Sequence, residues 1–216
     1  MSLSAGLLGC SPDGGGYDGG LDAPPLCGVG FLGDAGAPVE LAVTELDPDA
    51  SSRVIGDGSN VSLLFPPQGG RVIFAGVRAY NIDPCTVQLT GSLRDPTNGQ
   101  VNIDGRTVNL VVAGDGRGTS NDTDISTFAN ITVCPNEWSA TDVYGNPYDL
   151  TVSVTDHEGR SASKTVRVTP TCAEPARLAE CLCLCKHGYI LGSVCSDAGS
   201  SDTGTSDAGV GDGGVE

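Results

Sequence analysis

The middle of this 216-residue chain alternates apolar and polar residues in short runs. From about residue 36 to residue 170, apolar side chains recur at every second position, as in Val39, Leu41 and Val43. A period of two is that of a β-strand with one buried face, and turn residues about every 8–12 positions are typical of sandwiches and barrels. About 135 residues are enough to bury a two-sheet core. The pattern therefore predicts an all-β, antiparallel sandwich over residues 36–170.

The clearest strand pair lies at the end of this region. Alternating residues flank a Gly-containing turn there, namely Tyr148, Leu150, Val152 and Val154 before it and Ala162, Val166 and Val168 after it. This pattern resembles the closing hairpin of immunoglobulin-like (Ig-like) and PKD-like extracellular modules. The resemblance implies an Ig-like sandwich, with jelly-roll variants left open. It also implies that Tyr148 is a corner tyrosine, whose hydroxyl bonds to nearby backbone.

One of the nine cysteines stands apart from the others. Cys10 ends the segment Leu7-Leu8-Gly9-Cys10, which resembles the lipobox of bacterial lipoproteins, where the cysteine sulfur is acylated and the cysteine becomes the new N-terminus. The resemblance implies a signal at residues 1–10 and a lipid on Cys10, although no Lys or Arg precedes it. The alternative is a frayed terminus with one stray thiol.

Eight cysteines remain, an even number that permits four disulfides in an oxidising compartment: Cys27, Cys85, Cys134, Cys172, Cys181, Cys183, Cys185 and Cys195. We expect Cys85 to pair with Cys134, because each lies at a strand end beside a proline. We further expect Cys27 to pair with Cys172, joining the entry of the domain to its exit. Residues 171–196 are expected to form a small disulfide-rich module, with one helical turn possible near residues 173–182.

Two other interpretations of this cysteine cluster stay open. Cys183-x-Cys185-x-x-Gly188-Tyr189 with Cys195 resembles the C-terminal half of an EGF module, but the six-cysteine pattern is incomplete. A zinc site would use Cys181, Cys183, Cys185 and His187. Four ligands at alternating positions of a straight strand cannot surround one ion, because zinc requires a tetrahedral arrangement. Disulfides are therefore the favoured interpretation.

Composition limits the partners of the chain. Its formal net charge of −16 argues against nucleic acid, since phosphate binding requires clustered Lys and Arg. No run of about 18 apolar residues is present, so membrane attachment is expected through the lipid. Residues 11–35 are rich in Gly, Asp and Pro, which predicts a flexible tether. Residues 197–216 repeat Asp every fifth position, which predicts a disordered spacer.

Calcium is the only ion with candidate ligands outside the cysteine cluster. Asp115, Asp122 and Asp124 lie in the loop at residues 114–124 and could converge at one end of a sandwich. The alternative is an ordinary turn stabilised by Asx side chains. No other cofactor is expected.

Catalytic motifs are scarce. His157 and His187 are the only histidines, and no nucleophile elbow, P-loop, zinc-protease helix or dinucleotide fingerprint occurs. A pair of carboxylates for glycoside hydrolysis stays open, because spacing is a three-dimensional property. We expect no enzyme.

The layout as a whole resembles predicted lipoproteins of the myxobacterial kind. That resemblance implies a lipid-anchored location in the cell envelope, at the outer membrane or cell surface. We therefore expect a non-catalytic lipoprotein that presents an Ig-like binding or structural module, with a protein or polysaccharide as possible partner. The alternatives are a secreted calcium-dependent adhesion or matrix protein and an envelope hydrolase.

Overall fold

A computed structural model describes residues 27–195 of the protein. The predictions for Cys10 and the signal, for the tether as far as residue 26, and for the tail at residues 197–216 lie outside the described residues. The elements are β1 (Glu40–Leu46), β2 (Ser52–Val54), β3 (Ser59–Leu63), β4 (Arg71–Tyr80), β5 (Val87–Arg94), β6 (Val101–Val108), β7 (Val111–Val112), β8 (Gly118–Thr119), η1 (Ile125–Thr127), β9 (Ala129–Cys134), β10 (Tyr148–Thr155), β11 (Ser161–Cys172), η2 (Pro175–Arg177) and α1 (Leu178–Leu184).

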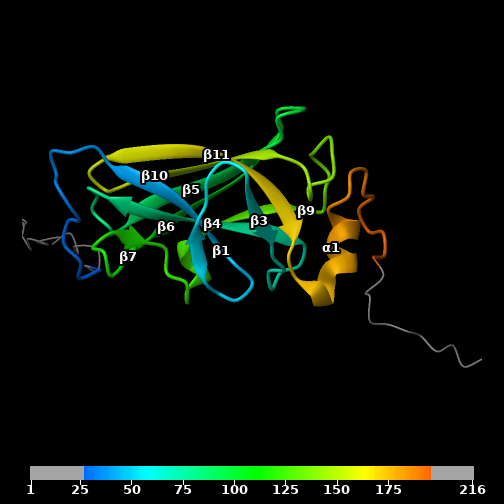
Figure 1. The fold of residues 1–216 in the computed structure, drawn as a ribbon, viewed down its shortest axis with the longest axis horizontal. Coiled ribbons are helices and arrows are strands. Elements are labelled where there is room, and N and C mark those ends of the chain that lie inside the picture. Colours follow the sequence, from blue (N-terminus) through cyan, green and yellow to red (C-terminus); the bar gives the residue numbers. More distant parts are fainter. Residues whose placement is uncertain (1–26, 196–216) are drawn as a thin grey trace, which may run out of the picture.

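These strands form two sheets (Figure 1). One sheet has the order β2-β1-β4-β8-β7, with β9 also paired to β4, and the other has the order β3-β11-β10-β5-β6. The prediction of a two-sheet, mostly β protein is confirmed. The prediction that all pairs are antiparallel is wrong, because β3 runs parallel to β11. That strand continues to Cys172, beyond Val168 where its pairing with β10 ends, and β3 lies along the continuation.

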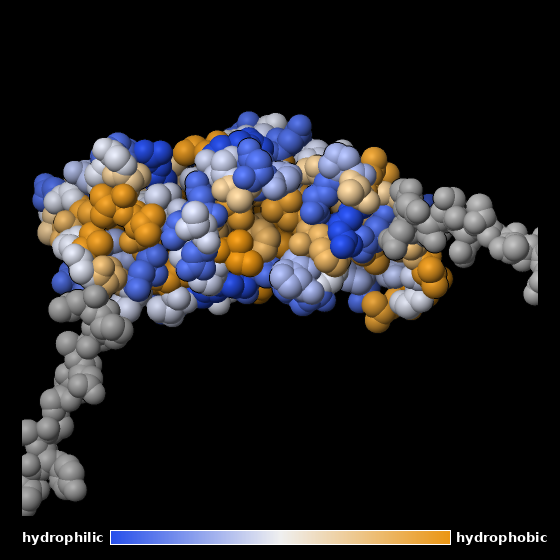
Figure 2. Space-filling model, turned by 90° about the horizontal axis from the view of Figure 1, so that it is seen from below, coloured by the Kyte–Doolittle hydropathy of each residue, from blue (hydrophilic) through white to orange (hydrophobic). Residues whose placement is uncertain are grey.

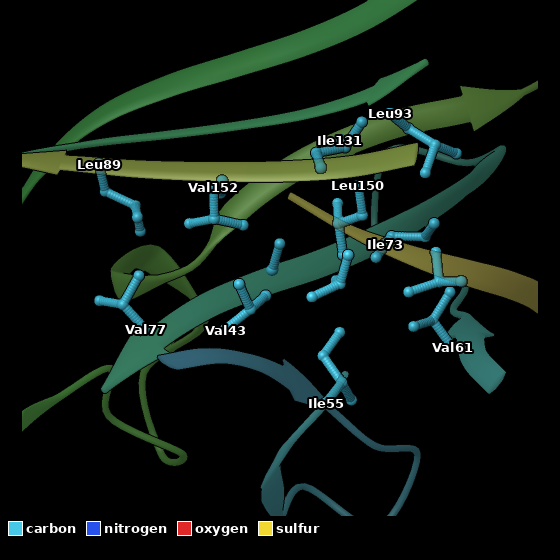
Figure 3. Packing of buried hydrophobic residues seen from close by; sticks show 14 of the residues in the cluster. Val43, Ile55, Val61, Ile73, Val77, Leu89, Leu93, Ile131, Leu150 and Val152 are labelled. Carbon is cyan, nitrogen blue, oxygen red and sulfur yellow. The ribbon is translucent and has the colours of Figure 1, made fainter. Parts of the chain in front are cut away.

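Aliphatic side chains from both sheets fill the space between them. Figure 3 shows Val43, Ile73 and Val77 of one sheet pointing toward Leu150 and Val152 of the other. In β10 every second residue from Tyr148 to Val154 is buried, as the alternating sequence predicts. Each fully buried aliphatic side chain contributes roughly 1.5–3 kcal/mol from removal of its surface from water. This core is the main source of stability in the described chain.

Strand β4 is buried on both faces, unlike β10. Its outer face carries Val72 and Phe74, which pack with Phe128 in a second, smaller apolar cluster. Gly76 makes this packing possible, because a Cβ atom there would lie 2.6 Å from the Phe128 ring. The run of buried residues in β4 is therefore continuous rather than alternating.

The C-terminal segment, defined here as residues 173–195, forms a short helix rather than a strand. The alternating arrangement assumed for Cys181 to His187 is therefore wrong, whereas the helical turn expected nearby is present. Cys181 of α1 and Cys185, the residue that caps this helix, lie one turn apart, and both are buried against the sandwich. Figure 2 shows apolar patches on the face seen from below, one of them at the end of the molecule that carries this segment.

The eight expected cysteines form four disulfides among the described residues: Cys27–Cys85, Cys134–Cys185, Cys172–Cys181 and Cys183–Cys195. Both predicted pairings, Cys85–Cys134 and Cys27–Cys172, are wrong. Cys85 follows the end of β4, whereas Cys134 lies opposite its first residue, Arg71. Ten strand residues span roughly 30 Å, and a disulfide requires Cα atoms within about 7 Å. The C-terminal segment is also no separate EGF module, because Cys185 is bonded to the sandwich.

Candidate binding groove between two sheet edges

The groove forms where the free edges of the two sheets meet. Strand β6 ends one sheet, and β9 pairs only with β4 in the other. The sheets approach closely here because Gly91 of β5 has no side chain: a Cβ atom would lie 2.7 Å from that of Ala129. Asp104 of β6 then reaches across, and the backbone N–H of Asn130 in β9 donates to its carboxylate at 2.7 Å. A side chain therefore joins two strands that share no backbone ladder.

The groove has a volume of about 420 Å³, which is within the usual size range of ligand sites. Eight residues line it: Asn102, Ile103 and Asp104 of β6, Asn130 and Thr132 of β9, and Pro135, Glu137 and Trp138 of the following loop. Three of these offer carbon surface, including Ile103, which is 68% exposed. The other five offer amide, hydroxyl or carboxylate groups. Neither Lys nor Arg is among the eight, so the lining is mildly acidic.

Trp138 is the single tryptophan of the chain, and the fold holds it in place. Its indole N–H donates to the Val133 carbonyl at 2.8 Å, and its ring packs against Tyr148 with the ring centroids 5.7 Å apart. The Asn98 side chain donates to its backbone carbonyl at 2.8 Å. Because the N–H is already bonded, the indole can offer only carbon surface to a ligand.

A buried polar network supports the loop that carries Trp138. The Tyr148 hydroxyl donates to the Asp142 carbonyl at 3.1 Å, which confirms the backbone contact predicted for it. It also lies 2.5 Å from the hydroxyl of Ser139, which donates to the carboxylate of Asp95 at 2.9 Å. Burial raises the pKa of Tyr148, despite its hydrogen-bond contacts with Ser139 and Thr141, which act in the opposite direction. The loop is therefore preorganised by groups that lie outside the groove.

Asp95 is the anionic centre of this network. Its carboxylate also accepts from the backbone N–H groups of Ala140 at 2.8 Å and Thr97 at 2.7 Å. Burial acts to raise the pKa of Asp95, but these hydrogen bonds outweigh it, and the pKa lies below its ordinary value. The charge is thus stabilised where it joins the Trp138 loop, at Ala140, to the turn between β5 and β6, at Thr97.

The C-terminal segment braces the same loop from the other side. The backbone N–H of Asn136 donates to the Leu184 carbonyl at 2.9 Å, next to the Cys134–Cys185 disulfide. His187 donates its backbone N–H to the Asp142 carboxylate at 2.7 Å, and its ring lies 3.0 Å from the Ser139 carbonyl. His187 is therefore a positioning residue for the loop, which its place beside the cysteines did not reveal.

The structure does not bring the predicted calcium ligands together. Asp115 is paired with Arg78 at 2.7 Å, and Asp124 accepts from the backbone and hydroxyl of Ser126. Asp122 shares neither the Arg78 partner of Asp115 nor the Ser126 partner of Asp124. Within residues 27–195, no group of three or more His, Cys, Asp and Glu side chains is placed to hold a metal ion. The loop at residues 114–124 is thus built from local turns and an ion pair.

The most perturbed carboxyl group lies away from the groove. Glu45 of β1 is only 1% exposed, and burial raises its pKa to about 7. The backbone N–H of Ser62 and the guanidinium of Arg53 both bond to it and act in the opposite direction. A group sealed in this way makes stability depend on pH, and it cannot meet a ligand directly.

Comparisons with known proteins do not identify the chain: no family model, curated protein or solved structure matches it significantly. In the part of the chain that the structure describes, no helix is long and apolar enough to cross a membrane. The four disulfides indicate a protein that folds outside the cytoplasm. The groove is the described feature that most resembles a ligand site.

Sequence reasoning missed this groove, although one signal was available. Along β6, the polar residues Asn102 and Asp104 alternate with the apolar Val101 and Ile103. Here the polar set faces inward, opposite Leu93 and Gly91 of β5, and the apolar set is exposed. Because β6 lies at the edge of its sheet, its inward-facing side chains can be polar and can line a site.

Proposed function

We propose that this protein is a non-catalytic, lipid-anchored protein of the cell envelope that presents an Ig-like module with a ligand-binding groove. The four disulfides support a location outside the cytoplasm. The Leu7-Leu8-Gly9-Cys10 segment supports acylation of Cys10. A single acyl chain binds membranes only weakly, so stable anchoring requires more than one chain or a second membrane signal.

The observation that carries this proposal is the placement of the groove. Figure 1 shows the first described residues at one end of the sandwich and α1 at the other. The Trp138 loop is bonded to α1, whereas Cys27 is bonded to Cys85 at the opposite end. The length of β4, roughly 30 Å for its ten residues, separates the two ends. A chain anchored through Cys10 would therefore hold the groove away from the membrane.

Two features support an Ig-like relationship for the sandwich. The β10–β11 hairpin has the expected alternation, and Tyr148 makes the hydrogen bond of a corner tyrosine. The protein departs from antibody domains in its disulfides, none of which joins β10 to the facing sheet. The proposal is thus a generic Ig-like module.

Mass spectrometry of the native protein tests the anchor directly. We expect residues 1–9 to be missing, Cys10 to carry acyl chains, and Cys10 to take no part in a disulfide. The Cys10→Ser variant should leave the membrane fraction, while Cys27→Ser should fold less well yet stay membrane-bound. An unmodified Cys10 in membrane-associated protein would overturn the anchor.

A further inference from the structure

We infer that the groove binds a neutral polysaccharide, with the carbon face of a sugar ring against Trp138. The inference rests on the proposed function, because it names the ligand of the same groove. Three properties of the lining support it: its charge, the state of its backbone groups, and the rigidity of its aromatic residue.

Charge disfavours an anionic ligand. Asp104 and Glu137 are the only charged residues among the eight that line the groove. Asp104 is partly neutralised by Arg106 at 2.6 Å, whereas Glu137 is exposed. The chain as a whole has a formal net charge of −16, so a polyanion is repelled at long range as well. A neutral ligand meets no such repulsion.

Backbone groups disfavour an added peptide strand. Peptides that bind a sheet edge rely on main-chain hydrogen bonds to it. Along the free edge of β9, the N–H of Asn130 is already taken by Asp104. Pro135, which follows the strand, has no N–H to offer. Because two N–H groups are missing from this edge, recognition by side chains is favoured over strand addition, and a ligand with many hydroxyl groups suits these side chains.

The remaining polar side chains of the groove can both donate hydrogen bonds to hydroxyl groups and accept hydrogen bonds from them. Asn102 can donate and accept, Thr132 can donate and accept, and Glu137 can accept. Trp138 and Pro135 supply the apolar surface for the carbon side of a sugar ring. Because Trp138 is fixed by its N–H bond and by Tyr148, little conformational entropy is lost when a ligand binds.

The single tryptophan makes the test specific to the groove. We propose fluorescence titration of the full-length protein with the neutral polysaccharides dextran, pullulan and galactomannan. Alginate serves as the anionic arm and poly-lysine as the cationic peptide arm. We expect a saturable change in Trp138 emission with at least one neutral polymer and no change with alginate. No response to any of the three neutral polymers overturns the inference.

Variants then locate the binding. Glu137→Ala and Asn102→Ala should each weaken binding about fivefold, since one hydrogen bond has a net value near 1 kcal/mol. The matched control is Glu158→Ala, at an exposed residue in the turn between β10 and β11, which should leave affinity unchanged. Equal affinity in all three variants would remove the groove as the site and contradict the proposed function too.

Two further results separate the ligand from the proposed function. Saturable binding of poly-lysine alone, weakened by Glu137→Ala, would overturn the sugar ligand but keep the groove as a binding site. Release of new reducing ends from the bound polymer would contradict the non-catalytic role while supporting the ligand class. The state of Cys10 is measured independently, so failure of the anchor leaves the ligand result intact.

Discussion

Between the two sheets the chain buries a continuous cluster of aliphatic side chains, whereas the C-terminal segment buries only Cys181 and Cys185. Three of the four disulfides involve that segment, and one joins Cys27 to Cys85 at the far end of the sandwich. Short segments that cannot bury enough apolar surface commonly depend on disulfides. The two regions therefore keep their shapes by different means, burial in one and covalent bonds in the other.

This difference has a functional counterpart at the groove. The sandwich supplies β6 and β9, and the C-terminal segment fixes the loop that carries Trp138. Arg71, which is fully buried, adds an ion pair to Glu180 of α1 at 3.1 Å. The segment acts as a brace for the groove and adds little to the core. Most of the following predictions test this division, and one tests a buried carboxyl group within the sandwich.

The largest effect is expected in the sandwich core. Ile131→Ala should lower the free energy of unfolding by about 2–5 kcal/mol, because Ile131 is fully buried in the main cluster. Leu182→Ala, in α1 and 36% exposed, is the matched change in the brace and should cost less than about 1 kcal/mol. Urea unfolding measures both. Equal losses would show that the brace has a core of its own.

The next effect depends on pH and on Glu45. In the unfolded chain this carboxyl titrates near 4.5, and in the folded protein burial raises its pKa to about 7. The folded state therefore holds a proton that the unfolded state releases between these values. The stabilisation from this bound proton is complete below pH 4.5 and is lost as the pH rises to about 7. Over this range, the free energy of unfolding should therefore decrease by about 3 kcal/mol.

Urea unfolding at several pH values across this window checks the prediction. The Glu45→Gln variant should remove the dependence, since its amide does not ionise. Its partner Arg53 is 44% exposed and stays solvated, so the variant should fold. An unchanged slope in the variant would assign the pH dependence to another group.

The strands were predictable where one face of a strand is buried and the other is not. β10 follows the alternation residue by residue, because the facing sheet covers only one of its two faces. β4 does not, since Phe128 and its neighbours cover the second face as well. α1 was harder still: a two-residue spacing of cysteines is the period of a strand, but in α1 it places Cys181 and Cys183 on different faces of a helix, where they bond to Cys172 and Cys195.

The inverted pattern of β6 could have marked one wall of the groove, but not its other wall, because the groove joins residues that are distant in sequence. Asn102 and Trp138 come together only after the two sheets form and pack closely at Gly91. The disulfide pairing failed for a related reason. Prolines mark Cys85 and Cys134 alike, but the direction of β4 places them at opposite ends. Local sequence defines elements well and long-range proximity poorly.

A smaller effect is expected from the network that supports the Trp138 loop. Ser139→Ala removes a buried hydrogen bond to Asp95 and should cost about 1–2 kcal/mol. Ser126→Ala removes a similar bond to Asp124 at the surface and should cost less than about 0.5 kcal/mol. Urea unfolding compares the two, and Trp138 fluorescence should shift only in the first. A shift in neither would mean that the loop is held by the C-terminal segment alone.

The smallest effect on the sandwich should come from breaking the outermost disulfide. In the double variant Cys183→Ser and Cys195→Ser, residues 186–195 lose the cross-link between the end of the segment and α1. Because only surface residues lie in this stretch, global unfolding should change by less than about 1 kcal/mol, while limited proteolysis should cut there much faster. Ligand binding should persist, since Cys134–Cys185 still holds α1 beside the groove loop. Loss of binding in this variant, with the sandwich intact, would extend the brace to the last residues of the segment and make its two ends equally important for the groove.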